Sequence, residues 1–234
     1  MKTLTKYLNE KLIINQRFDE KLIINKDYKD LYTCEPKTFE ELRKIIEDRY
    51  DKLGPGTKDM PIDFNDVDVS NIDSFYNKND YKGIFQFQIA KFKYIDISDW
   101  DVSNVENMHN MFYCCNELKS VGDLSKWDIS KVTNMSDMFF ACKELKSVGD
   151  LSNWNVSKVE DMQGMFSSCE KLISVGDLSN WNVSNVKDMS AMFSNCKQLK
   201  SVGDISNWKL SNARFMYYMF AKSGITNIPK WYKK

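Results

Sequence analysis

A repeat of 27 residues constrains the fold of this chain more than any other feature of its sequence. Tryptophan, methionine, phenylalanine and valine each recur at that spacing from the middle of the chain towards its end. The tryptophans of the series are Trp100, Trp127, Trp154, Trp181 and Trp208. Because so short a unit cannot bury an apolar face alone, we expect successive units to stack in register around one shared core.

The first and last units depart from the repeat. Residues 67–72, VDVSNI, match the start of the unit at Trp100, but the step is 33 residues because six are inserted between Phe75 and Ile84. The last unit is truncated after Phe220 and ends in SGITNIPKWYKK. Atypical terminal units are typical of stacked arrays, since they must cover an otherwise open core.

The unit that starts at Trp181 reads WNVSNVKDMSAMFSNCKQLKSVGDLSN. Its DMSAMFSNC segment has apolar residues at helical spacing, which predicts one or two turns of helix. The segments QLKSVGDLSNW and WNVSNV predict extended chain that pairs in parallel with the next unit. The predicted fold class is therefore an α/β repeat solenoid with short helices and parallel strands, plus a small N-terminal cap and arm. We interpret the tryptophans as core, with an exposed sugar-stacking strip as the alternative.

The pattern Leu-x-x-Val-x-x-Leu-Ser-x-Trp-x-Val-Ser-x-Val-x-x-Met-x-x-Met-Phe-x-x-Cys resembles the BspA-like leucine-rich repeats of bacterial surface proteins. The resemblance covers roughly residues 62–228. It implies a curved, right-handed leucine-rich-repeat solenoid that serves in protein binding or adhesion, and it implies no catalytic residues. Residues 35–61 also look like the segment before the repeats in such proteins. Two departures are a glycine that lengthens each unit by one residue, as at Gly149, and the lack of a visible secretion or anchoring signal.

The chain divides into three predicted segments. Residues 34–61 contain a capping box at Thr38–Glu41, which predicts a helix with one apolar face that caps the first coil. Gly54-Pro55-Gly56 is expected to end that helix. Residues 62–234 form the solenoid with its C-terminal cap, and residues 1–33 form an N-terminal arm.

The arm carries a duplicated motif, EKLIIN, at residues 10–15 and 20–25. The two copies either pair as a hairpin folded back on the solenoid or add as strands to a partner. Such arms resemble those of virion-associated proteins of tailed phages. The candidate docking residues are Leu12, Ile13, Ile14, Leu22, Ile23 and Ile24.

Composition and charge exclude several classes of protein. The chain has 33 basic and 33 acidic residues, and this neutrality argues against a nucleic-acid partner, which requires excess positive charge. No apolar run approaches the roughly 20 residues of a membrane span. The first residues lack the features of a signal peptide. We therefore expect a cytoplasmic or virion-associated protein, with the cell surface reached only by a non-standard route.

No constellation of residues predicts catalysis, a metal site or a cofactor. His109 is the one histidine, and with Cys114 and Cys115 it lacks the usual spacing of a zinc site. A nucleophilic pair of His109 and Cys115 has no third, orienting group. The six cysteines are expected to be reduced. An aspartate in each unit could bind calcium between coils, but a solvated, hydrogen-bonded turn is favoured.

The predicted function is non-enzymatic protein interaction or adhesion through the solenoid surface. The alternative is a structural component of a larger assembly, such as a phage virion, docked through the arm. The partners would be proteins, in a larger assembly or a homo-oligomer. The exposed aromatics of the last unit are either a cap or a sticky end. The candidate interaction residues are Lys119, Asp123, Lys146, Asp150, Asp177, Lys200, Asp204, Phe215, Tyr217 and Tyr218.

Overall fold

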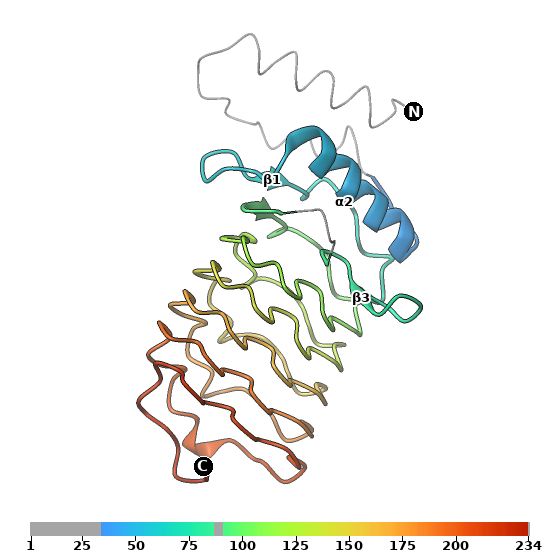
Figure 1. The fold of residues 1–234 in the computed structure, drawn as a ribbon. Coiled ribbons are helices and arrows are strands. Elements are labelled where there is room, and N and C mark those ends of the chain that lie inside the picture. The colour runs from blue at the N-terminus through green and yellow to red at the C-terminus, as the bar shows by residue number, and fades with distance from the viewer. Residues whose placement is uncertain (1–33, 87–90, 234) are drawn as a thin grey trace.

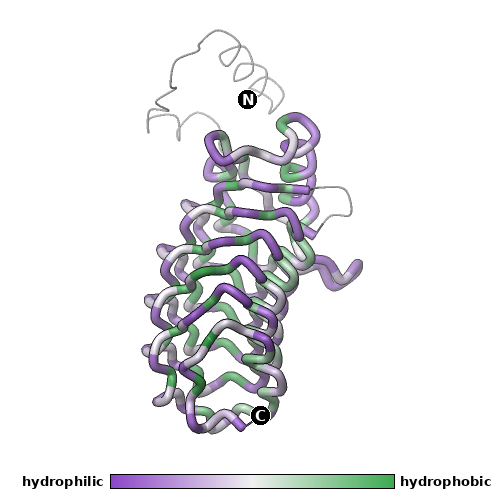
Figure 2. The backbone as a smooth tube through the Cα atoms, turned by 60° about the vertical axis from the view of Figure 1, so that its left-hand side comes forward, coloured by the Kyte–Doolittle hydropathy of each residue, from purple (hydrophilic) through white to green (hydrophobic). Residues whose placement is uncertain are grey.

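The computed structural model describes residues 34–86 and 91–233, which form an elongated stack (Figure 1). Successive units lie one beneath another between the N-terminal helix and the C-terminal tail, as the tube in Figure 2 shows. Isolated parallel bridges join equivalent positions of neighbouring units. One series of bridges runs through Ser74, Asn107, Asn134, Asp161, Asp188 and Phe215. The prediction of a repeat fold with units in register is confirmed, and each unit is called a coil below.

The apolar ladders of the repeat form one continuous core. Each tryptophan from Trp100 to Trp208 is at most 5% exposed. Its indole N–H donates to a backbone carbonyl of the preceding coil, as from Trp154 Nε1 to Leu124 O at 2.9 Å. The phenylalanine rings stack from coil to coil with centroids 4.8 to 6.0 Å apart. The core interpretation of the tryptophans is therefore confirmed, and the sugar-stacking strip is wrong.

The expected short helix in each coil is wrong. Residues 188–196 form turns, and Ala191 and Asn195 have left-handed φ angles of 56° and 59°. Their N–H groups donate to the next coil, Ala191 N to Tyr217 O at 2.8 Å and Asn195 N to Ala221 O at 2.7 Å. An α-helix would direct such N–H groups to the carbonyl four residues back. Stacking between coils therefore uses the donors that a helix requires.

Regular elements are few within the described coils. Strand β1 (Ile62–Asp63) pairs in parallel with β4 (Ile95–Asp96), which joins the first unit to the next. Strands β2 (Tyr76–Asn77) and β3 (Lys82–Gly83) form an antiparallel hairpin. This hairpin contains the insertion noted in the sequence. A short 3₁₀ helix, η2 (Ile205–Asn207), directly precedes Trp208.

Helix α2 (Phe39–Leu53) covers the N-terminal end of the stack (Figure 1). Thr38 Oγ1 accepts from Glu41 N at 3.2 Å, as the capping box predicts. The Glu41 carboxylate instead accepts from Lys37 N at 2.7 Å, one residue before the predicted donor. The helix ends at Gly54, where φ is 72°. The division of the chain into three segments stays a prediction, and the arm at residues 1–33 lies outside the described residues.

The buried face of α2 is fixed to the first unit by apolar and ionic contacts. Leu42 and Ile46 are fully buried. The Arg49 guanidinium forms two hydrogen bonds with the Asp66 carboxylate, at 2.6 and 2.7 Å, and its side chain is only 3% exposed. Two parallel hydrogen bonds between a guanidinium and a carboxylate fix the relative orientation of the two groups and strengthen their interaction. The pair therefore holds α2 in a defined orientation on the first unit.

Candidate interaction surface

A row of mostly basic side chains follows one side of the stack. We call Lys93, Lys119, Lys146, Ile173 and Lys200 the lysine row, because they occupy equivalent positions in successive coils. Backbone hydrogen bonds link the first four members in order, as from Ile173 N to Lys146 O at 3.0 Å. Ile173 interrupts the charge and is 58% exposed. Lys119 is half-buried, with its Nζ 5.7 Å from the centroid of the Tyr94 ring. The fold thus places the three predicted lysines in one line.

The predicted aspartate row lies beside it, and its carboxylates serve the turns. Oδ1 of each aspartate accepts from the N–H two residues on, at 2.9 to 3.0 Å. The row is Asp123, Asp150, Asp177 and Asp204. Hydrogen bonds from Ser152 hold the pKa of Asp150 below its usual value. A Cβ placed on Gly176 would lie 1.9 Å from Asp150 Oδ1, so glycine is required there.

The interpretation of this row as a hydrogen-bonded turn is confirmed. The calcium alternative gains no support, because each carboxylate is engaged locally. Among residues 34–86 and 91–233, no three His, Cys, Asp or Glu side chains are grouped in a way that could hold a metal ion.

Ion pairs between coils neutralise much of the charge on the sides of the stack. Lysine and glutamate at equivalent positions of adjacent coils approach to 2.6 or 2.7 Å. These pairs are Lys171 with Glu144, Lys197 with Glu170, and Lys187 with Glu160. Exposed pairs of this kind contribute little to stability, because water and salt screen them. They therefore affect the surface potential more than the stability.

The cysteine ladder is structural. The Cys169 thiol donates to Phe139 O of the preceding coil at 3.1 Å, and equivalent bonds occur at the neighbouring positions. All six cysteines are free, as expected. Burial raises the pKa of the Cys196 thiol to about 12, so the reactive thiolate is disfavoured.

His109 and Cys115 have different neighbours. The His109 ring lies edge-on to Tyr76, and its Nδ1 is 2.7 Å from Ser136 Oγ. Burial lowers the pKa of His109. Cys115 donates its thiol to Phe85 O at 3.4 Å, inside the stack, and burial raises its pKa to about 12. These contacts give no geometry for a nucleophile and its base.

Asp137 is an unusual site that the sequence reasoning missed. Burial, with help from the nearby Asp161 and Asp188 carboxylates, raises its pKa to about 6. Asp137 has a left-handed φ of 53°, and its Oδ1 lies where a Cβ on Gly164 would be. The available signal was its position, which is occupied by Asn110 in the preceding coil and by glycine in the next.

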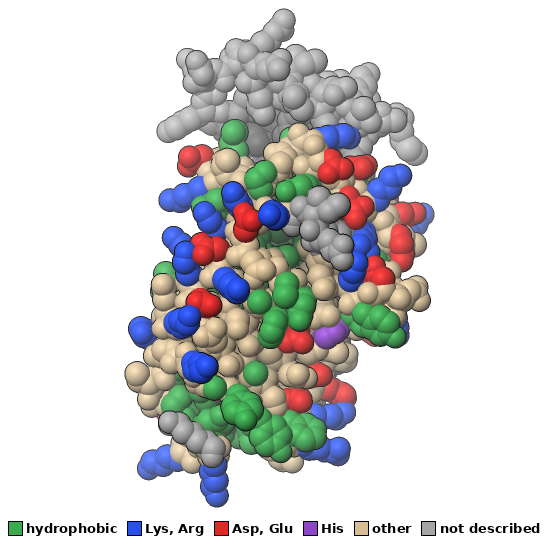
Figure 3. Space-filling model, in the orientation of Figure 1, with side chains coloured by type: hydrophobic (Ala, Val, Ile, Leu, Met, Phe, Trp, Pro, Cys, Tyr) green, Lys and Arg blue, Asp and Glu red, His purple; other side chains and the backbone are tan. Residues whose placement is uncertain are grey.

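The C-terminal coil combines a partial cap with exposed aromatics. Trp231 stacks on Trp208 with centroids 6.4 Å apart, and Tyr232 lies edge-on to Phe220 at 5.1 Å. The aromatics predicted as candidates stay exposed: Phe215 by 46%, Tyr217 by 64% and Tyr218 by 73%. Hydrophobic side chains gather near this end in Figure 3. Coil and tail together enclose a hollow of about 780 Å³.

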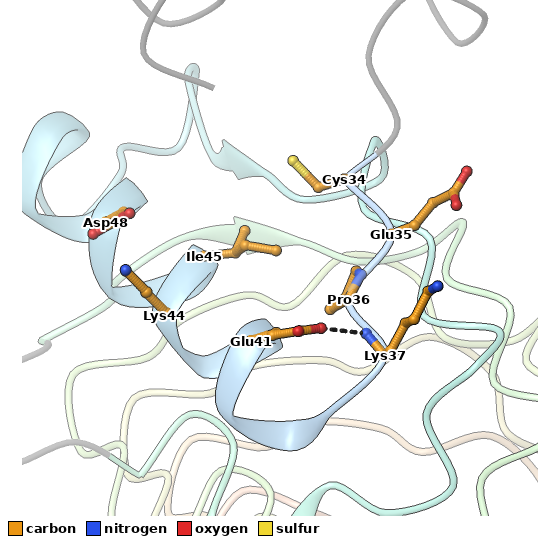
Figure 4. Close-up of a pocket in the computed structure, with 8 residues that line it drawn as sticks. All are labelled: Cys34, Glu35, Pro36, Lys37, Glu41, Lys44, Ile45 and Asp48. Atoms are coloured by element: carbon orange, nitrogen blue, oxygen red, sulfur yellow. Dashed lines mark hydrogen bonds between the residues drawn. The ribbon is translucent and has the colours of Figure 1, made fainter. Parts of the chain in front are cut away.

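A shallow depression of about 550 Å³ lies at the other end, between the start of the described chain and α2 (Figure 4). Its lining is mainly polar, including Glu35, Lys44 and Asp48. The dashed line in Figure 4 is the bond from Lys37 N to Glu41, which belongs to the helix cap. Cys34 lies at its edge, and burial raises the pKa of that thiol. This arrangement is that of a helix start.

The predicted docking residues of the arm lie outside the described residues, so their role stays a prediction. Within the described ranges, no helix has the length and apolar character needed to cross a bilayer.

These features define a repeat protein whose coils stack around a single core and expose regular rows of side chains. Two overlapping segments, residues 79–175 and 149–232, match the family described as Mycoplasma protein of unknown function, DUF285. Together they span more than half of the chain, which therefore belongs to this family.

A crystal structure of a leucine-rich repeat protein from Eubacterium ventriosum is similar, with 19% sequence identity and a TM-score of 0.42. The match covers 70% of this chain and 44% of that one, so the chain spans less than half the length of the solved protein. No curated protein matches the chain.

Proposed function

We propose that the chain is a non-enzymatic leucine-rich-repeat solenoid of the BspA-like type, and that it binds a protein partner through the lysine row. The observation that carries this proposal is the row itself. Stacked coils hold its side chains in line, and the exposed Ile173 lies between Lys146 and Lys200. An apolar side chain flanked by cations fits a partner surface with an apolar contact and acidic neighbours.

Rigidity supports this role. The lysine and aspartate rows belong to coils whose tryptophan and phenylalanine ladders are buried and stacked. The backbone that carries these side chains is therefore already ordered before a partner binds. A preorganised surface loses less entropy on association than a mobile one. Among the described residues, the aspartates beside the row are held by their own turns and act as fixed charges.

The proposal includes no catalytic group, cofactor or nucleic-acid partner. Several described titratable groups engage in turns, in ion pairs between coils or in buried contacts, as Asp150, Glu160 and Cys169 illustrate. An active site needs such groups to converge on a space where a substrate fits. The hollow at the C-terminal end is lined by aromatic, aliphatic and basic residues without an acid.

The test is affinity capture with charge-matched variants. The full chain is immobilised, incubated with lysate of a bacterium that encodes it, and the captured proteins are quantified by mass spectrometry. A variant with Lys146→Glu and Lys200→Glu is compared with one carrying Lys126→Glu and Lys158→Glu, which are exposed lysines elsewhere on the coils. A partner should be lost at least fivefold with the first variant only. Equal capture by both variants would reject the lysine row as the binding surface.

The duplicated EKLIIN motif favours a second candidate function, a structural component of an assembly such as a phage particle. In that case residues 1–33 would dock the chain, and the stack would be the displayed part. Deletion of residues 1–33 separates the two functions. An assembly component should lose incorporation, whereas a binding module should keep its partner.

A further inference from the structure

At each junction between these coils, one ladder of four backbone hydrogen bonds runs from the N–H groups of one coil to the carbonyls of the next, while bonds elsewhere, such as Arg214 N to Lys187 O at 2.8 Å, run in the opposite direction. At the last junction the distances are 2.7 to 2.9 Å. The donors are Met189, Ala191, Phe193 and Asn195, and the acceptors are Phe215, Tyr217, Met219 and Ala221. The same alternating pattern occurs at the three junctions before it. Along this ladder, the last coil therefore presents donors to which no further coil supplies acceptors among the described residues.

In the last coil the equivalent donors are the N–H groups of Met216, Tyr218, Phe220 and Lys222. Within the described part of the chain, no hydrogen-bond acceptor faces any of these four N–H groups. All four residues line the hollow of about 780 Å³. The tail forms hydrogen bonds with other groups, such as the bond from Trp231 Nε1 to Ile205 O. Tyr218 is 73% exposed, so water can reach its N–H group at the edge of the hollow. A ligand that supplies acceptors would replace that water along the ladder.

The charged side chains that line the hollow are all basic. Residues 205–233 contain five basic residues and no aspartate or glutamate. Three of them, Arg214, Lys222 and Lys233, line the hollow together with the exposed rings of Tyr217 and Tyr218. The sides of the stack, by contrast, carry paired charges. The end therefore attracts an acidic ligand that also has apolar side chains.

We propose that this open end binds an acidic polypeptide segment of a partner protein, which lies along the last coil as a further coil would. Alternate backbone carbonyls of the segment accept from the four N–H groups, and its acidic side chains face Arg214 and Lys222. The proposal rests on the proposed function for the existence of a protein partner, but it uses the end of the stack and not the lysine row.

Charge argues against two other occupants. Two copies joined end to end would bring two basic surfaces and two rows of donors together. The chain's own residues 1–33 contain seven basic and five acidic residues, so they are not complementary to the end. A volume of this size accommodates a short peptide stretch.

The sequence of the chain offers a suitable probe, the peptide VEDMQGMFSSCE, which is residues 159–170. It contains three acidic residues and no basic one. In its own coil, the carbonyls of Asp161, Gln163, Met165 and Ser167 accept the four bonds of the ladder. Fluorescein-labelled peptide is titrated with the full chain under reducing conditions, and anisotropy is measured.

We expect saturable binding that weakens at least tenfold with Arg214→Glu combined with Lys222→Glu. The charge-matched control, Lys126→Glu with Lys158→Glu, should stay within twofold. A peptide with lysine in place of its three acids should not bind. No saturable binding by the acidic peptide, or equal affinity for both variants, would overturn the proposal.

Amide hydrogen exchange tests the geometry separately from the charge. Saturating peptide should slow exchange at Met216, Tyr218, Phe220 and Lys222 at least tenfold. Unchanged exchange at these amides overturns the proposal even if the peptide binds. It is also overturned if single-stranded DNA binds more tightly, or if self-association protects the same amides without peptide. The variant with Lys146→Glu and Lys200→Glu should bind the peptide normally, so failure here and failure of the proposed function are distinguishable.

Discussion

The two ends of the stack are closed by different means. At the N-terminal end, helix α2 buries Leu42 and Ile46 completely and fixes Arg49 to Asp66. At the C-terminal end, a short tail places the half-buried Trp231 and Tyr232 against the last rings of the ladders. A helix satisfies its own backbone groups, so it can cover an apolar end at low cost. The tail covers rings, but its described residues do not supply acceptors to the four N–H groups of the ladder in the last coil.

The two ends of one stack can therefore differ in how they are closed. We call the end covered by α2 the sealed end, and the end whose last described coil has unpaired backbone N–H groups the receptive end. An apolar core runs between both ends, and the direction of the hydrogen-bond ladder determines which backbone groups of the last described coil stay unpaired. If the comparison is right, substitutions at the N-terminal end should cost more stability than matched substitutions at the C-terminal end.

The largest effect is expected for Asp66→Ala, which leaves the buried Arg49 guanidinium without its carboxylate. Breaking a buried pair from one side costs roughly 3–5 kcal/mol. Denaturant unfolding of the full chain measures this loss. The control is Asp80→Ala, whose pair with Arg43 is more exposed, with a cost below about 1 kcal/mol. Equal losses would show that the ion pair of α2 does not close its end.

The same substitution at both ends sharpens the comparison. Ile46→Ala should cost about 3 kcal/mol, because the side chain is fully buried on the inner face of α2. Ile228→Ala in the half-buried tail should cost about 1 kcal/mol. Thermal unfolding monitored by tryptophan fluorescence compares the two. A larger loss at Ile228 would reverse the assignment of the sealed end.

Trp231→Ala should have an effect of about 1–2 kcal/mol, since Trp231 is only half-buried. The substitution removes the stacking on Trp208 and the bond to Ile205 O. Amide exchange should accelerate in residues 214–223 and stay unchanged in α2. Trp231→Phe keeps an aromatic ring and should lose less than about 1 kcal/mol, as expected for one hydrogen bond. Faster exchange in α2 would show that the ends are not independent.

The smallest effect, a gain, is expected for Asp137→Asn in the interior. Burial raises the pKa of Asp137 to about 6 in the folded protein, from an ordinary value of 3.8. Wild-type stability therefore falls as the pH rises from about 4 through 6. Asparagine is already present at the equivalent position, Asn110. With solvent screening taken into account, the substitution should raise the free energy of unfolding by about 1 kcal/mol at pH 7.5. Below pH 4 it should leave the free energy of unfolding unchanged. Melting temperatures at pH 4, 5.5 and 7.5 test this. A gain that persists at pH 4 would contradict the titration.

His109 contributes in the opposite direction. Burial lowers its pKa, so the neutral ring is favoured in the folded protein, and stability is lost as the pH falls below about 6.5. Wild-type pH profiles therefore combine both groups, and the Asp137→Asn variant isolates one of them. The Asp137→Asn substitution should not change the ratio of exchange rates at the two ends.

Much of the fold was readable from residue spacing. The register of the tryptophans, the start of α2 at Thr38 and the turn role of Asp150 were predicted, because each depends on local chemistry or on simple periodicity. The predicted helix at residues 188–196 failed because its donors pair with the next coil. Of the candidate surface, the lysines and aspartates fall in adjacent rows. The unusual Asp137 was missed, because its environment is built by three successive coils.

The sequence by itself determined which side chains meet, since a fixed period of 27 residues puts like residues at like places in each coil. Only the tertiary structure decided where the backbone N–H groups point. That choice depends on contacts between residues 26 positions apart, as between Met189 and Phe215, which no local pattern encodes. It turned the expected helices into turns and left four donors without partners among the described residues of the last coil.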